Sequence, residues 1–200
     1  MEGLHERDVA ADPVVQFRAW FAEAGESERQ PDAMALATAT RDGAPSVRMV
    51  LLKSADERGL SFGTNFDSRK GRELDDNPRA AVTFHWVGRH RQVRAEGRVE
   101  RLPDAESDAI WHARPRGARL AAAASRQSEP VADREALERA YAEVDARFPG
   151  ENVPRPPSWG GYRLIPDAWE FWQGRDNRLH DRLRYEQDGE GGWRVVRLSP

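Results

Sequence analysis

The chain has 200 residues, of which 38% are hydrophobic and 32% are charged, with a formal net charge of −3 and no cysteine. This composition is typical of a globular chain with a hydrophobic core, and the acidic balance excludes general electrostatic attraction to nucleic acid or to an acidic membrane. The absence of cysteine excludes disulfide bonds and thiolate catalysis. The sequence has neither a signal-peptide pattern nor an apolar run of about 18 residues, so we expect a cytoplasmic protein with no membrane partner. We also expect no nucleic-acid partner.

The first predicted element is a helix that begins at Asp12-Pro13. Asp12 is a favourable N-cap and proline suits the first helical position. Apolar residues follow at spacings of three and four, which places Val14, Phe17, Trp20 and Phe21 on one stripe. This helix therefore has one face to bury.

Alternating apolar and polar residues, separated by turn signals such as Asp42-Gly43, predict a series of short strands. They cover residues 33–41, 47–53, 60–64, 80–86, 92–102, 162–165, 169–173, 182–185 and 193–198. Short strands at close spacing indicate an antiparallel barrel or sandwich.

Helices interrupt this pattern mainly in the middle of the chain. Ser68 is positioned to cap a short helix that stops before Pro78, and further helical segments are expected over 103–113, in part of 114–128 and over 134–148. The sequence thus predicts one domain over residues 1–200, mainly β with α, and a helical elaboration at about 103–148.

The first segment that indicates a binding site is 64–70, TNFDSRK. Here a strand end supplies the hydroxyl of Thr64, a helix start supplies free backbone N–H groups, and Arg69 and Lys70 supply positive charge, which together suit a phosphate. The alternative is an ordinary serine cap followed by two exposed cations.

Two other sets of cations stand out. Arg48 and Lys53 bracket an apolar strand but have opposite parity, so they serve one ligand only if the strand twists or ends between them, or if two subunits share the site. In an extended segment after Gly174, one face would carry Arg178, His180, Arg182 and Arg184. The alternative for this row is a solvated edge strand.

Several familiar sites are not indicated. The sequence has no GxGxxG after a strand, no phosphate-binding P-loop motif and no GxSxG. The histidines are scattered without the spacing of metal ligands, so we expect no metal.

Taken together and in this order, a set of short motifs closely resembles the pyridoxine/pyridoxamine 5′-phosphate oxidases. The motifs are RMVLLK (48–53), TN (64–65), SRKG (68–71), RQV (91–93), RPRG (114–117), QS (127–128), WGGY (159–162) and EFWQG (170–174) through RLHDR (178–182). The resemblance extends from about Gly3 to Pro200. It implies an FMN-binding split β-barrel with accessory helices, used as a homodimer with the FMN between the subunits.

The resemblance also implies the site residues. FMN contacts fall on Arg48, Lys53, Thr64, Arg69, Lys70, Gln92, Gln127, Ser128, Trp172 and Arg182. Substrate contacts fall on Lys53, Arg114, Arg178 and His180, of which Arg178 and His180 are the residues expected at the reacting ring.

Three positions depart from the family pattern. Gly63 and Ile110 stand where the family usually has Tyr, and Ala118 stands where it usually has Ser. The usual residues at 110 and 118 donate to the substrate phosphate, and losing two such bonds costs about 3–6 kcal/mol if nothing replaces them. The adjacent Arg119 is the candidate replacement.

The implied activity is the FMN-dependent oxidation of pyridoxamine or pyridoxine 5′-phosphate to pyridoxal 5′-phosphate, with O2 as acceptor and H2O2 as product. One alternative is a related flavin oxidase with another substrate such as a dihydrophenazine, which the changes at Ile110 and Ala118 favour. The other alternative is a non-catalytic flavin-binding protein.

Overall fold

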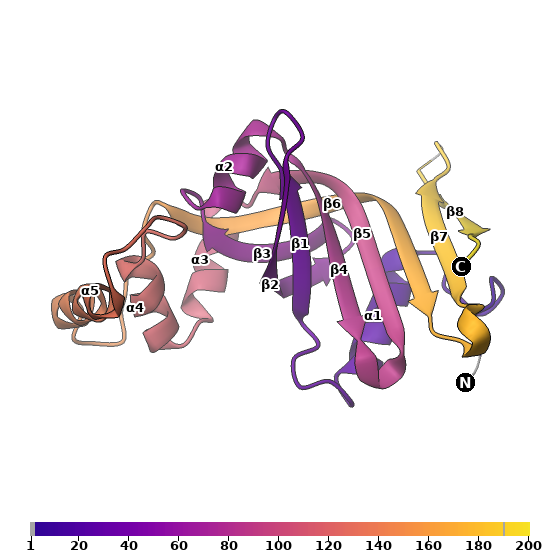
Figure 1. Cartoon of the computed structure of the whole chain (residues 1–200), viewed down its shortest axis with the longest axis horizontal. Helices are drawn as coiled ribbons and strands as arrows, with labels where there is room; N and C mark the ends of the chain where they lie inside the picture. Colours follow the sequence, from indigo (N-terminus) through magenta and orange to yellow (C-terminus); the bar gives the residue numbers. More distant parts are fainter. Residues whose placement is uncertain (1–2, 190) are drawn as a thin grey trace.

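A closed six-stranded barrel, extended at one side by two further strands, forms the centre of the molecule in the computed structural model, which describes residues 3–189 and 191–200 (Figure 1). The strands are β1 (Ala33–Ala39), β2 (Pro45–Asp56), β3 (Gly59–Asn65), β4 (Arg79–Trp86), β5 (Arg91–Arg101), β6 (Trp159–Gln173), β7 (Asp181–Gln187) and β8 (Trp193–Arg197). All pair antiparallel in the order β3-β2-β1-β4-β5-β6-β7-β8, and an additional β3–β6 pairing closes the barrel. The predicted antiparallel barrel, mainly β with accessory helices, is confirmed.

Helix α1 (Pro13–Ala24) packs its predicted apolar stripe against the barrel core. The Asp12 carboxylate accepts from the Val14 N–H at 2.7 Å and caps the helix. Phe17 is fully buried, with its ring centroid 5.0 Å from that of Phe84 and 5.5 Å from that of Trp169. Aromatic packing therefore fixes this helix to β4 and β6.

The other helices are α2 (Arg69–Asp76), α3 (Asp104–His112), α4 (Arg116–Ala124) and α5 (Arg134–Arg147). A second apolar cluster, separate from the barrel core, consists of Trp111, Leu120, Val153 and Trp159. It joins α3 and α4 to the start of β6, and side chains of α5 pack against it. Figure 1 shows the result: α4 and α5 lie at one end of the molecule, and β7 and β8 lie at the other.

The sequence prediction of two strands at 162–165 and 169–173 is wrong, because β6 is a single strand. It passes through Pro166, which lacks an N–H and usually ends a ladder. A register shift between Glu96 and Gly97 of β5 places Gly97 opposite Pro166. The β-bulge thus accommodates the proline within the strand.

The prediction that four cationic side chains after Gly174 share one face of an extended segment is also wrong. Asp176–Arg178 forms a short 3-10 turn, with Asn177 and Arg178 at φ values of 56° and 62°, and β7 begins only at Asp181. Arg182 and Arg184 share one face of β7, whereas Arg178 and His180 belong to the turn that precedes it.

In the part of the chain that the structure describes, no helix is long and apolar enough to cross a membrane.

Candidate functional site

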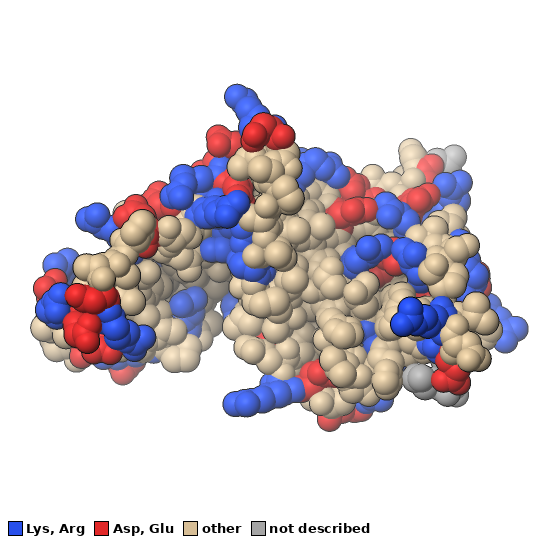
Figure 2. All heavy atoms as spheres, viewed as in Figure 1, with Lys and Arg blue, Asp and Glu red and all other residues tan. Residues whose placement is uncertain are grey.

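A hollow of about 1200 Å³ lies between the barrel strands β2 and β3 and the helices α4 and α5. Figure 2 shows the surface hollowed between the helical end and the barrel, with Lys and Arg side chains along its margin. The predicted site residues that line it are Arg48, Lys53, Thr64, Arg69, Lys70, Arg114, Gln127 and Ser128.

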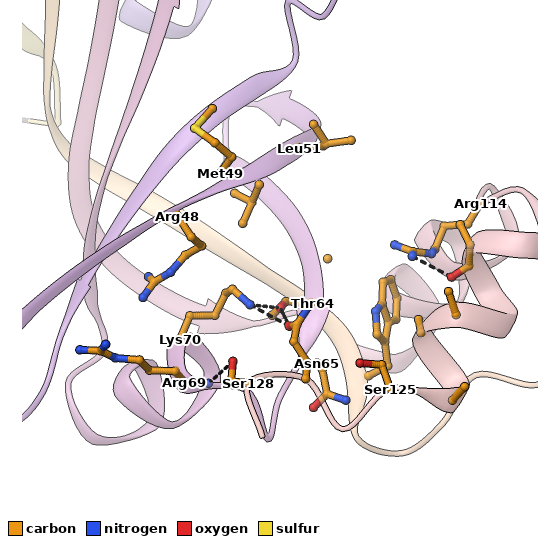
Figure 3. Close-up of a pocket in the computed structure, with 18 of the residues that line it drawn as sticks. Arg48, Met49, Leu51, Thr64, Asn65, Arg69, Lys70, Arg114, Ser125 and Ser128 are labelled. Carbon is orange, nitrogen blue, oxygen red and sulfur yellow. Dashed lines mark hydrogen bonds between the residues drawn. The ribbon is translucent and has the colours of Figure 1, made fainter. Parts of the chain in front are cut away.

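On the barrel side, the centre of the site is Lys70, which is only 7% exposed. Its Nζ donates to Thr64 Oγ1 at 3.0 Å, to Ser68 Oγ at 3.2 Å and to Gln127 Oε1 at 2.8 Å (Figure 3 labels Thr64 and Lys70). Burial, together with the nearby charge of Arg48, lowers the pKa of Lys70 to about 8. All three acceptors are uncharged, so this ammonium has positive charge available for an anion.

Glu73 of α2 organises the other two cations of this wall. Its carboxylate accepts from Arg48 at 3.2 Å and from Arg69 at 2.8 Å, and also from the hydroxyls of Thr38 and Ser46 at 2.5 Å each. Burial would raise its pKa, but these hydrogen bonds outweigh burial and lower the pKa to about 2. Glu73 was not among the predicted site residues, although its four-residue spacing from Arg69 on one helix face could have indicated it.

The opposite parity of Arg48 and Lys53 does not separate them, because both line the hollow. A register shift between Leu52 and Ser54 places a β-bulge at Lys53, so simple alternation does not extend along the whole of β2. The strand irregularity was one of the possibilities left open by the sequence.

Arg114 forms the facing wall, on the segment between α3 and α4, and Figure 3 shows it across the hollow from Lys70. Its Nη2 donates to the Ala118 carbonyl at 3.0 Å, and its guanidinium lies 5.1 Å from the ring centroid of Trp159. Its Nε is buried and has no hydrogen-bond partner among the described residues, and burial lowers its pKa. This cation is therefore desolvated, and no carboxylate in the part of the chain that the structure describes forms an ion pair with it.

The positions that depart from the family pattern lie around this wall. Ala118 lines the hollow, but Arg119 does not: it is buried, with Nη2 3.5 Å from a carboxylate oxygen of Glu151. Arg119 is therefore not placed to replace a missing phosphate donor. A Cβ at Gly63 would lie 2.7 Å from the Trp159 ring, so the indole occupies the space that a side chain at 63 would need.

The remaining predicted site residues form a separate group at the other end of the molecule. Gln92, Trp172 and Arg182 are direct cross-strand neighbours on β5, β6 and β7. The imidazole of His180 lies 4.7 Å from the Trp172 ring, and Arg178 is exposed on the adjoining turn. None of these five lines the hollow.

Glu170 supports this second group from the same outer face of the sheet. Its carboxylate is 3% exposed and accepts from Arg182 Nε at 2.9 Å, and Arg94 contacts it as well. Burial would raise the pKa of Glu170, but the hydrogen bonds from Arg182 and Arg94 lower it. Arg182 is thereby held beside Trp172.

Among the described residues, no group of three or more His, Asp or Glu side chains is arranged to hold a metal ion.

Two family models match the chain. The model described as pyridoxamine 5′-phosphate oxidase matches residues 21–148, and the model described as pyridoxine 5′-phosphate oxidase C-terminal dimerisation region matches residues 159–200. The pyridoxine/pyridoxamine 5′-phosphate oxidase of Cupriavidus pinatubonensis is 56% identical over 98% of this chain and 93% of its own. That of Rubrobacter xylanophilus is 56% identical over 99% of this chain and 91% of its own.

Solved structures share the fold of this chain. PhzG from Burkholderia lata 383, in complex with tetrahydrophenazine-1-carboxylic acid, is 39% identical with a TM-score of 0.93, covering 100% of this chain and 99% of PhzG. A pyridoxamine 5′-phosphate oxidase-related, FMN-binding protein from Nostoc punctiforme shares the fold, with a TM-score of 0.75 at 20% identity over 94% of this chain and 98% of its own. The oxidase family and the split-barrel fold that the sequence predicted are confirmed, and the chain belongs to the pyridoxamine 5′-phosphate oxidase family.

Proposed function

We propose that this protein is an FMN-dependent oxidase that converts pyridoxamine or pyridoxine 5′-phosphate to pyridoxal 5′-phosphate, with O2 as acceptor and H2O2 as product. The observation that carries the proposal is the presence of cations on two facing walls of one hollow: Lys70 with Arg48 and Arg69 on one side, and Arg114 on the other. Two walls of this kind suit two phosphates, one on the cofactor and one on the substrate. The names of the relatives at 56% identity support the same substrates.

The residues around Lys70 fit the phosphate of FMN. Lys70 has only uncharged acceptors, and Arg69, at the start of α2, adds both a guanidinium and a backbone N–H that contacts Ser128 Oγ at 3.2 Å. The residues of this wall that would hold FMN are Arg48, Lys53, Thr64, Arg69, Lys70, Gln127 and Ser128. Bound FMN would supply the hydride acceptor and the subsequent electron transfer to O2.

The second group of predicted residues requires a second subunit. Gln92, Trp172 and Arg182 lie side by side on β5, β6 and β7, away from the hollow of their own chain, so we propose that they complete the flavin site of a partner in a homodimer. The match to a C-terminal dimerisation region supports this assembly, as do Val47 and Met49 on β2, which are 68% and 64% exposed beside the hollow. Because β6 pairs with β3 and β5 of the barrel and also with β7, we propose that residues 1–200 form one domain.

In this arrangement each residue has a defined task. Lys53 and Arg114 bind the phosphate of the substrate, and the partner subunit's Arg178 and His180 orient the pyridine ring against the flavin. Orientation and charge are the contribution of the protein, and no side chain is assigned as an essential general base.

The direct test is turnover of pyridoxamine 5′-phosphate by the FMN-loaded protein, followed as O2 consumption and pyridoxal 5′-phosphate formation. We expect stoichiometric product and H2O2. A flavin-loaded protein that consumes no O2 at millimolar substrate would contradict the proposal.

A second candidate is the oxidation of a dihydrophenazine carboxylic acid. PhzG is solved with a tetrahydrophenazine carboxylic acid, and Ile110 and Ala118 of this chain lack the hydroxyls that the family usually offers to a phosphate. Higher kcat/KM for a dihydrophenazine carboxylate than for pyridoxamine 5′-phosphate would favour this candidate. Turnover of either substrate would exclude the non-catalytic flavin-binding protein.

A further inference from the structure

Helix α5 contributes a stripe of side chains to the hollow that no sequence motif indicated. The lining residues from this helix are Arg134, Leu137, Glu138 and Tyr141. Their spacings of three, one and three place them on one helix face, and Asp133 caps the helix by accepting from the Ala136 N–H at 2.6 Å. The stripe therefore has a fixed position opposite the barrel wall.

Tyr141 of this stripe lies close to the first turn of α4. Its hydroxyl is 3.5 Å from the position that a Cβ would take at Gly117. The neighbouring residue of the same turn, Ala118, accepts from Arg114 Nη2 through its carbonyl at 3.0 Å. The phenol and the desolvated guanidinium thus border the same turn of α4, at the same hollow.

The Tyr141 ring is packed in place, whereas its hydroxyl has no hydrogen-bond partner among the described residues. The ring packs against the apolar cluster that includes Trp111 and Leu120. The hydroxyl belongs to a residue that lines the hollow, and no hydrogen bond from it to another residue in the ranges 3–189 and 191–200 is found. A phenol held by its ring at the same hollow as Arg114, for which no carboxylate partner is found among the described residues, is a preorganised donor for an anion.

We propose that Tyr141 donates a hydrogen bond to the substrate phosphate beside Arg114 and so replaces donors absent at Ile110 and Ala118. This inference rests on the proposed function, which supplies the phosphate. Other members of the stripe are less suited, because Arg134 Nε is paired with Glu138 at 2.8 Å and Leu137 is apolar. Ser125 also lines the hollow but lies at the other end of α4, on the side of Asn65 (Figure 3).

The test compares Tyr141→Phe with the unaltered FMN-loaded protein. We expect about a tenfold rise in KM for pyridoxamine 5′-phosphate, equivalent to about 1.4 kcal/mol, with kcat within about twofold, because a phosphate contact remote from the reacting carbon contributes uniform binding. Calorimetric binding of pyridoxal 5′-phosphate should weaken by the same factor. FMN affinity, and kcat/KM for pyridoxamine without its phosphate, should not change.

Two further variants sharpen the test. Ala118→Ser should lower KM more in the Tyr141→Phe background than in the unaltered protein, because both hydroxyls would serve one phosphate. Tyr185→Phe removes a hydroxyl that donates to the Ala10 carbonyl at 2.7 Å, outside the hollow, and should leave KM unchanged.

The outcomes separate the inference from the function on which it rests. An unchanged KM and an unchanged pyridoxal 5′-phosphate affinity in Tyr141→Phe would overturn the role of Tyr141, as would an equal loss with unphosphorylated pyridoxamine. An unaltered protein that neither binds nor oxidises the phosphorylated pyridines would instead overturn the proposed function.

Discussion

Lys70 combines burial with positive charge, and its ionisation should control cofactor binding. Its pKa is lowered to about 8 by burial and by Arg48, so in the FMN-free protein it loses its proton as the pH rises through about 8. Because the unfolded chain keeps that proton up to its ordinary pKa of 10.5, the folded state gains stability relative to the unfolded state between these two values as pH rises. A bound phosphate has the opposite preference and requires the protonated amine.

FMN affinity should therefore fall by about tenfold between pH 7 and pH 9, as the protonated fraction of Lys70 falls. Flavin fluorescence titration measures this directly. Riboflavin, which lacks the phosphate, is the matched control and should bind with no such pH dependence. In Lys70→Met we expect weaker FMN binding that does not vary over this range; an unaltered protein with constant FMN affinity would refute the role of Lys70.

Glu73→Gln should lower the free energy of unfolding by about 3 kcal/mol at neutral pH, because it leaves Arg48 partly buried without its carboxylate. The pKa of Glu73 is lowered to about 2, so its contribution is present above its ordinary value of 4.5 and is lost as pH falls from there toward about 2. Urea unfolding at pH 7 and at pH 3 should show the difference shrinking in acid. Glu57→Gln, on an exposed turn, is the control, and an equal effect of both changes would contradict the assignment.

At the scale of single residues, the sequence was informative where a motif keeps several functional groups within a few positions. Thr64, Arg69 and Lys70 could be assigned together because a strand end runs directly into a helix start. Tyr141 could not be found in this way, since its place at the hollow depends on how α5 packs against α4. Arg119 was a wrong candidate for the missing phosphate donor, because a residue next to Ala118 on a helix does not point to the same side as Ala118.

At the scale of elements, β6 depends on its bulge opposite Pro166. A Cβ at Gly97 would lie 2.1 Å from the Ile165 carbonyl oxygen, a contact that only a backbone shift relieves. We expect Gly97→Ala to destabilise the protein by about 2 kcal/mol or more, because two paired strands must separate. Gly150→Ala, whose Cβ would meet nothing within 4 Å, is the control. Equal thermal midpoints for the two variants would show that this close approach is unimportant.

The elements that the sequence located well are those with local signals. The helix at Asp12-Pro13 and the turn at Asp42-Gly43, where Gly43 has a φ of 90°, follow from capping and turn chemistry. The continuity of β6 was missed because proline ordinarily ends a strand, and only the partner strand β5 shows how it is tolerated. The pairing of β6 with β5, and not the local preference of proline, determines that β6 is one continuous strand.

At the scale of the whole molecule, the predicted site is divided between two ends of one chain. The hollow lined by Lys70 lies between the barrel and α4. The turn with Arg178 and His180 adjoins β7 at the other end of the molecule (Figure 1). In the proposed two-fold dimer, the two surfaces would meet across the interface without any change of fold. Each active site would then use the hollow of one subunit and the C-terminal strands of its partner.

Mixing two inactive variants tests this central claim most directly. One variant carries Arg69→Ala with Lys70→Met and the other carries Arg178→Ala with His180→Ala, so each homodimer has a defect in both of its sites. Co-expression with two different tags allows the heterodimer to be purified, and in a shared-site dimer one of its two sites has no substitution. We predict that this heterodimer oxidises pyridoxamine 5′-phosphate at about half the rate of the unaltered dimer. A purified heterodimer as inactive as its parents would contradict a site built from two subunits.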